Sequence, residues 1–358
     1  MRPHQSGGRL VGKGSYACSF SPPPACATGS GSGGAGDIGK VSIQDMSEEA
    51  DIGRTLMRLP RAADFFAVPT SICVPTLPIT DPDAGRCPVL RKKGPFSLSR
   101  MTDAGVPLSR WGIHAHPRAE RGKGVTEAAL ETQVRHLLEG MVLYQSAGIV
   151  HNDIHWGNVL VDPSGRGRYI DFGQAYRVAD LRVWEDLRLG RRFLAEYIWI
   201  APELQSLRIR ATYGSGEDER GLAGIHDATD HLYAKTPEYR QLETEYPHRT
   251  TLRTVLREFP GKVGDEDAVI AYMRAGGAPR IDWWRLGVCL WALWRKTGQR
   301  SAILRRVIGG LTEFDPAVRM SPATALRIFG SRRQTQKRPG RVSTHRKTYS
   351  RSYIERRR

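Results

Sequence analysis

One stretch of the sequence decides the fold: GIVHNDIHWGNVLVDPSGRGRYIDFG, residues 148–173. It contains His151, Asp153 and Asn158 in the pattern His-x-Asp-x-x-x-x-Asn, and Asp-Phe-Gly follows at 171–173. Phosphoryl transfer requires a carboxylate that orients the attacking hydroxyl and accepts its proton, together with oxygen ligands for a bridging Mg²⁺. Asp153 suits the first task. The oxygens of Asn158 and of the aspartate in Asp-Phe-Gly suit the second.

Two segments outside this stretch have the apolar periodicity of helices. In residues 125–146 apolar side chains recur every three or four positions, which predicts an amphipathic helix. Residues 281–294 predict a largely buried helix, whose strongly apolar run LGVCLWALW has only nine residues. A membrane-spanning helix needs roughly 20 apolar residues. We therefore expect no membrane as a partner.

The first hundred residues have a different character, with many glycines and short apolar runs. IGKVSI at 38–43 alternates as a strand does, and residues 87–101 predict two more strands. A helix is predicted between them, from Asp45 to Pro60. This part of the sequence therefore predicts a small, sheet-rich lobe.

The motifs at 151–158 and 171–173 resemble the catalytic loop and the metal-binding loop of the protein kinase superfamily in residue type, order and spacing. The resemblance implies a bilobal α+β fold, ATP and Mg²⁺ as cofactors, and a protein substrate. The expected divisions of the chain are a β-rich lobe (1–105), a mainly helical lobe (106–330) with a long insert (204–280), and a disordered basic tail (331–358).

The same resemblance implies roles for the residues of the central stretch. Asp153 would be the catalytic base, Asn158 would belong to the catalytic group, and Asn158 and Asp171 would hold Mg²⁺. Structural roles would fall to His151, Phe172 and Gly173.

Three later motifs occur where this family has them. Ala-Pro-Glu at 201–203 matches the motif that closes the activation segment. Asp282, in Asp-x-Trp-x-x-Gly, opens the apolar helix and would anchor the backbone of the catalytic loop. Arg319, in FDPAVRMSPATAL at 314–326, would form a buried bidentate ion pair with Glu203, an arrangement that guanidinium geometry favours.

In the small lobe, Gly12-x-Gly14-x-x-Ala17 resembles the glycine-rich loop that covers ATP, with Ala17 in place of the third glycine. Gly12 and Gly14 would let backbone N–H groups approach the phosphates. Lys40 resembles the strand lysine that binds the α- and β-phosphates, and Glu49 its partner on the following helix. The register alone leaves two neighbouring acids open as alternatives, Glu48 and Asp51.

The catalytic loop departs from the family at two places. Asn152 replaces the arginine that often binds a phosphorylated activation loop, and residues 174–200 contain no Ser or Thr. We therefore expect activity without Ser/Thr phosphorylation of that segment. His155 stands where most Ser/Thr protein kinases have a lysine, and it is similar to the histidine of aminoglycoside-type phosphotransferases. Either it takes part in catalysis through a hydrogen bond, or it only packs the loop.

Two further departures concern the substrate. Glu196 stands where Ser/Thr kinases commonly have a threonine that contacts the catalytic aspartate. About 78 residues separate Glu203 from Asp282, where the family has a short connection. The insert at 204–280 either replaces the peptide-docking surface, covers the activation segment, or is a surface excursion without a role.

The function that the sequence favours is phosphoryl transfer from Mg-ATP to protein hydroxyls, with Ser or Thr preferred over Tyr. Two alternatives stay open. One is a pseudokinase scaffold with a polyanion-binding tail, to which Ala17 and His155 point; the other is a small-molecule phosphotransferase of the aminoglycoside-kinase type. Within the superfamily, GSYACSFSPPPAC at 14–26 resembles divergent kinases encoded by large DNA viruses.

Positive charge is concentrated at the C-terminal end of the sequence. Of a formal net charge of +17, residues 331–358 contribute +10, from 11 Lys or Arg residues and one acid, Glu355. Such a segment binds nucleic acid or another polyanion by counterion release, or is simply a solvated, disordered tail.

The cysteines and the N-terminus predict the compartment. Five cysteines without a Cys-x-x-Cys pair favour free thiols over a disulfide or a zinc site. The first residues lack the apolar segment of a secretory signal. We expect an intracellular, reducing compartment, either the cytoplasm or nucleus of a host cell or a virion.

Overall fold

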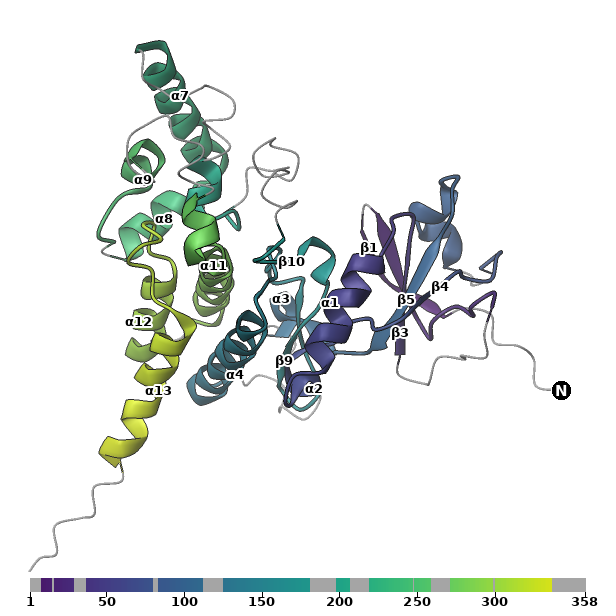
Figure 1. The fold of residues 1–358 in the computed structure, drawn as a ribbon. Coiled ribbons are helices and arrows are strands. Elements are labelled where there is room, and N and C mark those ends of the chain that lie inside the picture. Colours follow the sequence, from purple (N-terminus) through teal and green to yellow (C-terminus); the bar gives the residue numbers. More distant parts are fainter. Residues whose placement is uncertain are drawn as a thin grey trace, which may run out of the picture.

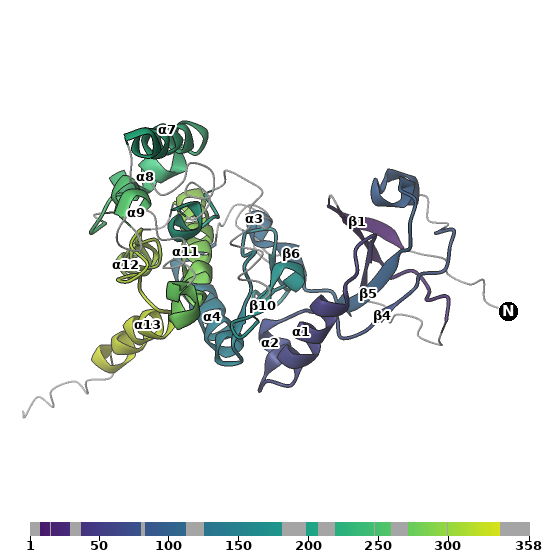
Figure 2. The same cartoon turned by 45° about the horizontal axis from the view of Figure 1, so that its top comes forward.

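The computed structural model describes residues 8–14, 16–28, 37–79, 83–111, 125–180, 198–206, 219–246, 248–258, 271–298 and 300–336. Its N-terminal region is built on a small antiparallel sheet and its C-terminal region is mainly helical (Figure 1). Helices α1 (Ser47–Met57) and α4 (Glu127–Ser146) lie between the sheet and the later helices in both views (Figure 2). The predicted α+β fold class is confirmed.

Five antiparallel strands form the sheet in the order β1-β2-β3-β5-β4. They are β1 (Arg9–Lys13), β2 (Ala17–Ser21), β3 (Asp37–Ser42), β4 (Ile72–Cys73) and β5 (Ser97–Thr102). Side chains alternate between the two faces of a strand, so one face of the sheet can be buried while the other stays accessible. The buried face and two neighbouring residues form a small apolar cluster: Cys18, Phe20, Val41, Leu98, Cys87 and Val89.

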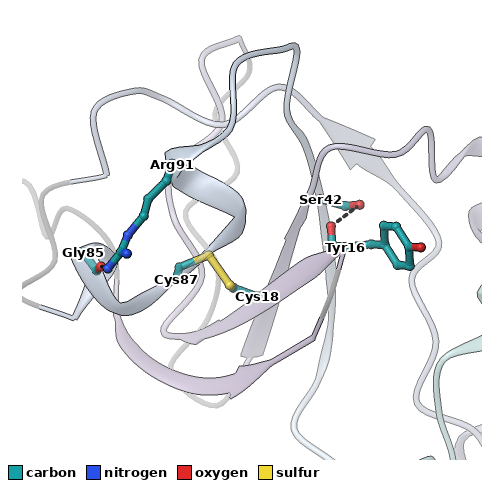
Figure 3. Close-up of a disulfide and its surroundings, with 6 residues drawn as sticks. All are labelled: Tyr16, Cys18, Ser42, Gly85, Cys87 and Arg91. Carbon is teal, nitrogen blue, oxygen red and sulfur yellow. Dashed lines mark hydrogen bonds between the residues drawn. A yellow bond between two sulfur atoms is a disulfide. The ribbon is translucent and has the colours of Figure 1, made fainter.

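The strand predicted at 38–43 is confirmed as β3, but only one of the two strands predicted within 87–101 forms. That one is β5. The residues before it make two short 3₁₀ helices instead, η1 (Ala84–Arg86) and η2 (Val89–Arg91). Arg91 donates a hydrogen bond of 2.7 Å to the carbonyl of Gly85 and so ties the two short helices together (Figure 3).

Two disulfides cross-link this lobe, so the expectation of free thiols is wrong for four of the five cysteines. Cys18 of β2 is bonded to Cys87, which lies between η1 and η2 (Figure 3), and Cys26 is bonded to Cys73 of β4. Cys289 is a buried free thiol. Disulfides persist in oxidising environments. The prediction of a reducing compartment therefore loses one of the two observations on which it rested, the pattern of the cysteines.

Helices α1 and α2 (Ala62–Phe65) follow β3 in the chain but do not pack with the sheet's apolar cluster. Asp45 accepts hydrogen bonds from the N–H and hydroxyl of Ser47, where α1 begins. The buried face of α1, with Ile52 and Leu56, belongs to the large apolar cluster of the helical lobe. In the chain, α1 and α2 thus fall within the predicted β-rich lobe (1–105), but their buried apolar residues pack with the helical lobe.

The predicted helix at 125–146 is confirmed as α4. Thr126 caps its N-terminus by accepting a hydrogen bond of 3.2 Å from the N–H of Ala129. Its buried apolar residues include Leu130, Val134, Leu137, Leu138 and Met141.

Short strands and a short helix flank α4 in the chain. Ahead of it come β6 (Val106–Pro107) and α3 (Leu108–Trp111); after it the polar stretch at 148–173 is held by short strand pairs. These strands are β7 (Ile149–Val150), which pairs with β10 (Tyr176–Arg177), and β8 (Val159–Val161), which lies between β6 and β9 (Gly167–Tyr169). The pairing brings the catalytic-loop and Asp-Phe-Gly motifs to adjacent turns.

The predicted apolar helix forms as α11 (Pro279–Thr297), and it packs against α12 (Ala302–Leu311). The last described helix, α13 (Pro322–Gln336), continues six residues beyond Gly330, where the sequence placed the start of the tail. The basic residues from 337 to 358 lie outside the described residues. Within the described ranges, no helix combines the length and the apolar character that crossing a bilayer requires.

The insert at 204–280 contains three helices, α7 (Glu219–Lys235), α8 (Glu238–Glu245) and α9 (Leu252–Glu258), and a turn of π-helix, η4 (Met273–Gly277). Four large side chains of the insert are fully buried. Two lie on α8, one on α9 and one on η4: Tyr239, Leu242, Leu252 and Met273. They join the apolar cluster of the helical lobe. The described helices of the insert are therefore part of the core, and the interpretation of a surface excursion is wrong for them.

Candidate active site

A lysine and two acids from three separate elements meet between the sheet and the helical lobe. Nζ of Lys40, on β3, lies 3.0 Å from Oε2 of Glu49 on α1 and 2.8 Å from Oδ1 of Asp171. The structure thus selects Glu49 from the three acids that the register left open. Asp51 instead lies 2.6 Å from Arg177 of β10, an ion pair that the sequence did not reveal.

The charges of this cluster fix its protonation. Burial opposes the charge of Lys40, but the carboxylates of Asp171 and Glu49 outweigh it and raise the pKa of the lysine. Burial also raises the pKa of Glu49, an effect that Lys40 offsets in part. At Asp171 the effect of burial is outweighed by Lys40, so its pKa lies below the ordinary value. Lys40 is therefore a cation at neutral pH.

The Asp-Phe-Gly turn has a constrained backbone. Asp171 has a positive φ of 58°, in the left-handed region that non-glycine residues rarely occupy. Phe172 is buried, and its ring centroid lies 4.2 Å from that of His151. A Cβ at Gly173 would lie 3.2 Å from Oδ1 of Asp171. The buried ring of Phe172 thus anchors the turn, and glycine at position 173 leaves room beside Oδ1 of Asp171.

The catalytic loop is fixed by a buried carboxylate at the start of α11. Asp282 accepts hydrogen bonds from the backbone N–H groups of His151 (2.8 Å) and Asn152 (2.9 Å), and from the hydroxyl of Tyr144 (2.9 Å). Burial raises the pKa of Asp282 to about 6, although these hydrogen bonds favour its ionised form. Asn152 has a φ of 57°, so the carboxylate secures a strained backbone. This is the contact that the sequence motif implied.

His151 is a neutral, structural histidine. Its Nε2 lies 3.0 Å from the carbonyl of Ile170, and its Nδ1 accepts the N–H of Asp153 at 3.3 Å. Burial lowers the pKa of His151 to about 4. The neutral ring with its proton on Nε2 satisfies both partners, and it joins the catalytic loop to the strand that leads to Asp171.

Asp153 and Asn158 are directly bonded. Nδ2 of Asn158 donates to the backbone carbonyl of Asp153 (2.9 Å) and to its Oδ2 (3.0 Å). Burial raises the pKa of Asp153, while Arg285 and His155 oppose that effect. The asparagine therefore orients the carboxylate expected to act as the base.

The same contacts show which oxygens suit a divalent cation. Because the amide nitrogen of Asn158 donates to Asp153, its Oδ1 is the atom of this side chain that suits a cation, and the carboxylate of Asp171 is the second candidate ligand. Mg²⁺ typically binds one or two protein groups together with substrate phosphates, and this donor set fits. Among the described residues, no group of three or more His, Cys, Asp or Glu residues could hold a metal.

His155 lies beside Asp153, with its Nε2 3.9 Å from Oδ2 of the aspartate. Its Nδ1 accepts the N–H of Gly157 at 3.0 Å, and a Cβ at Gly157 would lie 2.7 Å from the imidazole ring. Burial lowers the pKa of His155, and Asp153 opposes that effect. The ring is therefore neutral at pH 7, and a larger residue at position 157 would displace it from its present place.

Arg285 is a charged neighbour of this site that the motifs did not include. Its Nη1 lies 3.5 Å from Oδ1 of Asp153, and the residue is 8% exposed. A signal was present in the sequence, because an arginine directly precedes the apolar run LGVCLWALW of a helix predicted to be buried.

The helical lobe contains the expected buried ion pair. Arg319 donates from Nη1 to Oε1 of Glu203 at 2.6 Å and from Nη2 to Oε2 at 2.9 Å, and both side chains are fully buried. The residues just before Ala-Pro-Glu are held as well. Nε1 of Trp284 donates to the carbonyl of Ile198, and the hydroxyl of Tyr239 donates to that of Ile200, each at 2.9 Å. The insert thus supports this segment through α8.

The hairpin β1–β2 places the two glycines of the small lobe. Gly12 lies opposite Ser19, and the N–H of Gly14 donates to the carbonyl of Ala17 at 2.8 Å. A Cβ at either glycine would meet its neighbours at ordinary distances of 3.4–3.5 Å. The hairpin itself therefore does not require glycine at these positions. What glycine offers here is that another group can approach the backbone closely.

A groove of about 680 Å³ opens beside the catalytic loop. Its aromatic lining comes from Trp156 of that loop, Trp199 ahead of Ala-Pro-Glu, and Trp291 of α11. Basic side chains also line it: Lys235, Arg295 and Lys296. Glu196, predicted to bear on specificity, lies outside the described residues.

Comparisons with known proteins show similarity to protein kinases over part of the chain. No family model matches. The chain is 36% identical over 80 residues to mitogen-activated protein kinase kinase kinase 5 of Arabidopsis thaliana, and 36% identical over 61 residues to the MAP kinase kinase kinase SSK2 of Saccharomyces cerevisiae. It is 32% identical over 79 residues to mitogen-activated protein kinase kinase kinase 3 of Arabidopsis thaliana.

These matches are partial on both sides. They cover 22%, 17% and 22% of this chain, and 10%, 4% and 12% of the three relatives in the same order. Part of this protein is therefore similar to protein kinases, and the matched region spans at most 12% of the length of each of these relatives.

Proposed function

We propose that this protein transfers the γ-phosphoryl group of Mg-ATP to hydroxyl groups of protein substrates, with Ser or Thr preferred over Tyr. The observation that carries the proposal is the contact of Lys40 with both Glu49 and Asp171. Asp171 lies 131 residues from Lys40 in the chain, and a nucleotide-phosphate site is the arrangement that requires them together.

The chain's own residues have distinct tasks in this reaction. Lys40 would bind the phosphates, and the backbone near Gly12 and Gly14 would cover them. Asp153 would accept the proton of the acceptor hydroxyl as its oxygen attacks the γ-phosphorus. When bound, Mg²⁺ would neutralise charge on the phosphates, with Asn158 and Asp171 as its ligands.

A protein acceptor is favoured over a small molecule by the surroundings of Asp153. The groove beside Trp156 and Trp199 is about 680 Å³ in volume and adjoins the catalytic loop. The ion pair between Glu203 and Arg319 holds the segment that lines the groove, as protein kinases require of a peptide-binding surface.

The proposal is tested by unfolding and by transfer of radiolabelled phosphate to generic basic proteins. With ATP at 100 times its dissociation constant and Mg²⁺ present, the protein should gain about 2.7 kcal/mol of stability. Lys40→Met should lose most of this gain. Asp153→Asn should keep the gain but lose transfer, because the base does not bind the nucleotide. Phosphoamino acid analysis then reports the acceptor type.

The other outcomes separate the alternatives. No stabilisation by Mg-ATP would contradict the use of this nucleotide. Stabilisation without transfer to any acceptor would favour a pseudokinase scaffold, and transfer to an aminoglycoside panel alone would favour a small-molecule phosphotransferase.

We also propose that transfer does not require phosphorylation of the activation segment. Asn152 carries a neutral amide where an arginine would bind a phosphate, and Lys40 already contacts Glu49 in the unmodified chain. Protein produced together with a phosphatase should therefore transfer phosphate as fast as untreated protein. A loss of activity in the phosphatase-treated protein would contradict this.

For the basic tail we propose binding to a nucleic acid or another polyanion. Because α13 runs to Gln336, truncation after this residue removes basic residues and leaves the helix whole. Binding of a DNA duplex should weaken steeply with salt and be lost on truncation. Equal binding by the full and truncated chains would contradict a role of the tail.

A further inference from the structure

The groove beside the catalytic loop is connected to the catalytic carboxylate by a series of rings. Nε2 of His155 lies 3.9 Å from Oδ2 of Asp153, and the ring centroids of His155 and Trp199 are 6.4 Å apart. Trp199 in turn lies 5.5 Å from Trp156, and both tryptophans line the groove. An extended chain advances by about 3.3 Å per residue. A peptide whose hydroxyl meets Asp153 can therefore place a neighbouring residue in the groove.

The groove carries more positive than negative charge. Its described lining contains three cations and a single carboxylate: Lys235, Arg295, Lys296 and Glu238. Two of the cations are already engaged. Arg295 lies 3.5 Å from Glu245, an acid outside the lining, and Lys296 donates to the backbone carbonyl of Ser109. A carbonyl orders the ammonium group of Lys296 but does not neutralise its charge.

Lys235 is the cation of the groove that remains available to a ligand. It is the last residue of α7 and is exposed. Within the described ranges, no residue forms a hydrogen bond or an ion pair with it, Glu238 included. A cleft with excess charge of one sign and walls of low polarity focuses the electric field on its interior. The indole rings of the groove provide such walls.

These features favour an acidic side chain of the acceptor over other occupants. An aminoglycoside carries several positive charges, which the cations of the groove would repel. Single-stranded nucleic acid also binds to sites that combine cations with aromatic rings. The groove, however, adjoins the carboxylate at which the acceptor hydroxyl must be presented, and this is a place for the acceptor chain itself.

We propose that the groove selects acceptor segments with an acidic side chain close to the reacting hydroxyl, and that Lys235 determines this preference. The carboxylate would pair with Nζ of Lys235, and the chain that carries it would lie against Trp156, which is 40% exposed. The inference rests on the proposed function, because a preference among acceptors exists only if the protein transfers phosphate to them.

The experiment measures transfer from Mg-ATP to a library of serine peptides. The other positions of the peptides are random, and each is fixed in turn as Glu, Ala or Lys. In the wild type, Glu near the serine should exceed Ala by about 3- to 5-fold, the effect of a partly exposed charge pair. Lys should fall below Ala. Added salt should reduce the preference, because it screens exposed charges.

Variants of the lining assign the preference to its source. Lys235→Met should abolish the preference for Glu, Lys235→Glu should invert it in favour of Lys, and Lys235→Arg should retain it. Glu238→Gln removes the opposing carboxylate and should strengthen the preference. In all four variants KM for ATP should equal that of the wild type. Because Lys235 is exposed, its variants should also unfold at the temperature of the wild type.

The matched control is Arg306→Glu on α12. Arg306 is exposed and does not line the groove, so this variant makes the same change of charge elsewhere on the helical lobe. It should keep the preference of the wild type. Loss of the preference in this control would mean that the net charge of the lobe, and not Lys235, sets it, which would overturn the inference.

The remaining outcomes separate this inference from the proposed function. Equal transfer to the Glu, Ala and Lys peptides would overturn the inference and leave the proposed function intact. A preference for Glu that persists in Lys235→Glu would overturn the role of Lys235. A single-stranded oligonucleotide that competes with all peptides alike, without a preference for Glu, would assign the groove to nucleic acid instead. No transfer to any peptide of the library would overturn the proposed function and the inference with it.

Discussion

The sheet and the helical lobe are stabilised in different ways. The described apolar cluster of the sheet is small, and two of its members, Cys18 and Cys87, are joined as a disulfide. The helical lobe has a far larger cluster, in which Cys289 remains a thiol. Small cores supply little burial free energy and depend on cross-links, whereas large cores do not. The comparison shows that covalent bonds replace apolar burial in one lobe only.

The boundary between these two packing units passes through the candidate active site. Lys40 belongs to the cross-linked sheet, while Glu49 lies on α1, whose apolar face packs with the helical lobe. Asp171 belongs to the helical lobe as well. We therefore expect changes that loosen the sheet to affect the lysine first and to leave both acids in place.

The largest effect is expected from breaking the helical lobe at its buried ion pair. Arg319→Met leaves the carboxylate of Glu203 buried without its partner, and both side chains are fully buried in the native state. Removing one member of such a pair costs about 3–5 kcal/mol. Urea unfolding of the wild type and the variant measures this loss. Arg327→Met, an exposed substitution on α13, is the control and should be nearly neutral.

The next effect is expected from breaking the sheet. The disulfide between Cys18 and Cys87 spans 69 residues of the chain, so chain entropy predicts a loss of about 4 kcal/mol for the double change to alanine. Hydrogen exchange should rise in the strands β1 to β5 and stay slow in α11. The stabilisation of the variant by Mg-ATP should also be smaller than that of the wild type, because Lys40 belongs to the loosened sheet. Equal acceleration in the two lobes would contradict their separate stabilisation.

A smaller effect, confined to the helical lobe, depends on pH. Burial lowers the pKa of His248 from 6.5 to about 4, and its ring lies 4.5 Å from that of Phe314. As the pH falls from 6.5 towards 4, the unfolded chain takes up a proton here that the folded chain resists, so stability falls by about 3 kcal/mol. Above pH 6.5 this residue has no effect on the pH dependence.

The variant His248→Phe isolates that effect. Its free energy of unfolding should fall less steeply than that of the wild type between pH 6.5 and 4, because the other buried groups, His151 included, are common to both proteins. Parallel curves for the two proteins would show that His248 does not resist protonation.

The smallest effect is expected at the exposed ion pair between the lobes. Arg177 and Asp51 are 2.6 Å apart, with side chains 40% and 55% exposed. Exposed pairs contribute little, so Arg177→Met should leave the unfolding midpoint unchanged and alter KM for ATP by less than about twofold. A large change of the unfolding midpoint in Arg177→Met would contradict this expectation. It would mean that this ion pair, and not apolar packing, holds α1 to the helical lobe.

The sequence predicted a contact correctly where both of its residues belong to recognisable motifs. Asp282 lies at the loop backbone, Glu203 pairs with Arg319, and Lys40 pairs with one of three candidate acids. In each case the residue types and their order along the chain restrict the partner. The helices at 125–146 and 281–294 were predictable for a similar reason, because their apolar residues recur with the helical period.

Contacts without such a motif escaped prediction. The cysteine pairs are 69 and 47 residues apart, and only the folded sheet brings them together. In place of the first strand expected within 87–101 the chain forms η2, next to Cys87 of one of these disulfides. Arg285 was missed because the motif that contains it names only the aspartate, the tryptophan and the glycine around it.

The insert has a practical consequence for anyone who wants to trim this chain to a shorter version. Deleting α8 and α9 would expose Leu242 and Leu252, both fully buried now, and would take away the phenol that donates to the carbonyl of Ile200. That carbonyl lies just ahead of Ala-Pro-Glu. A shortened protein would thus lose solubility and the support of the segment at 198–200 together, so α8 and α9 cannot be removed as a surface loop could.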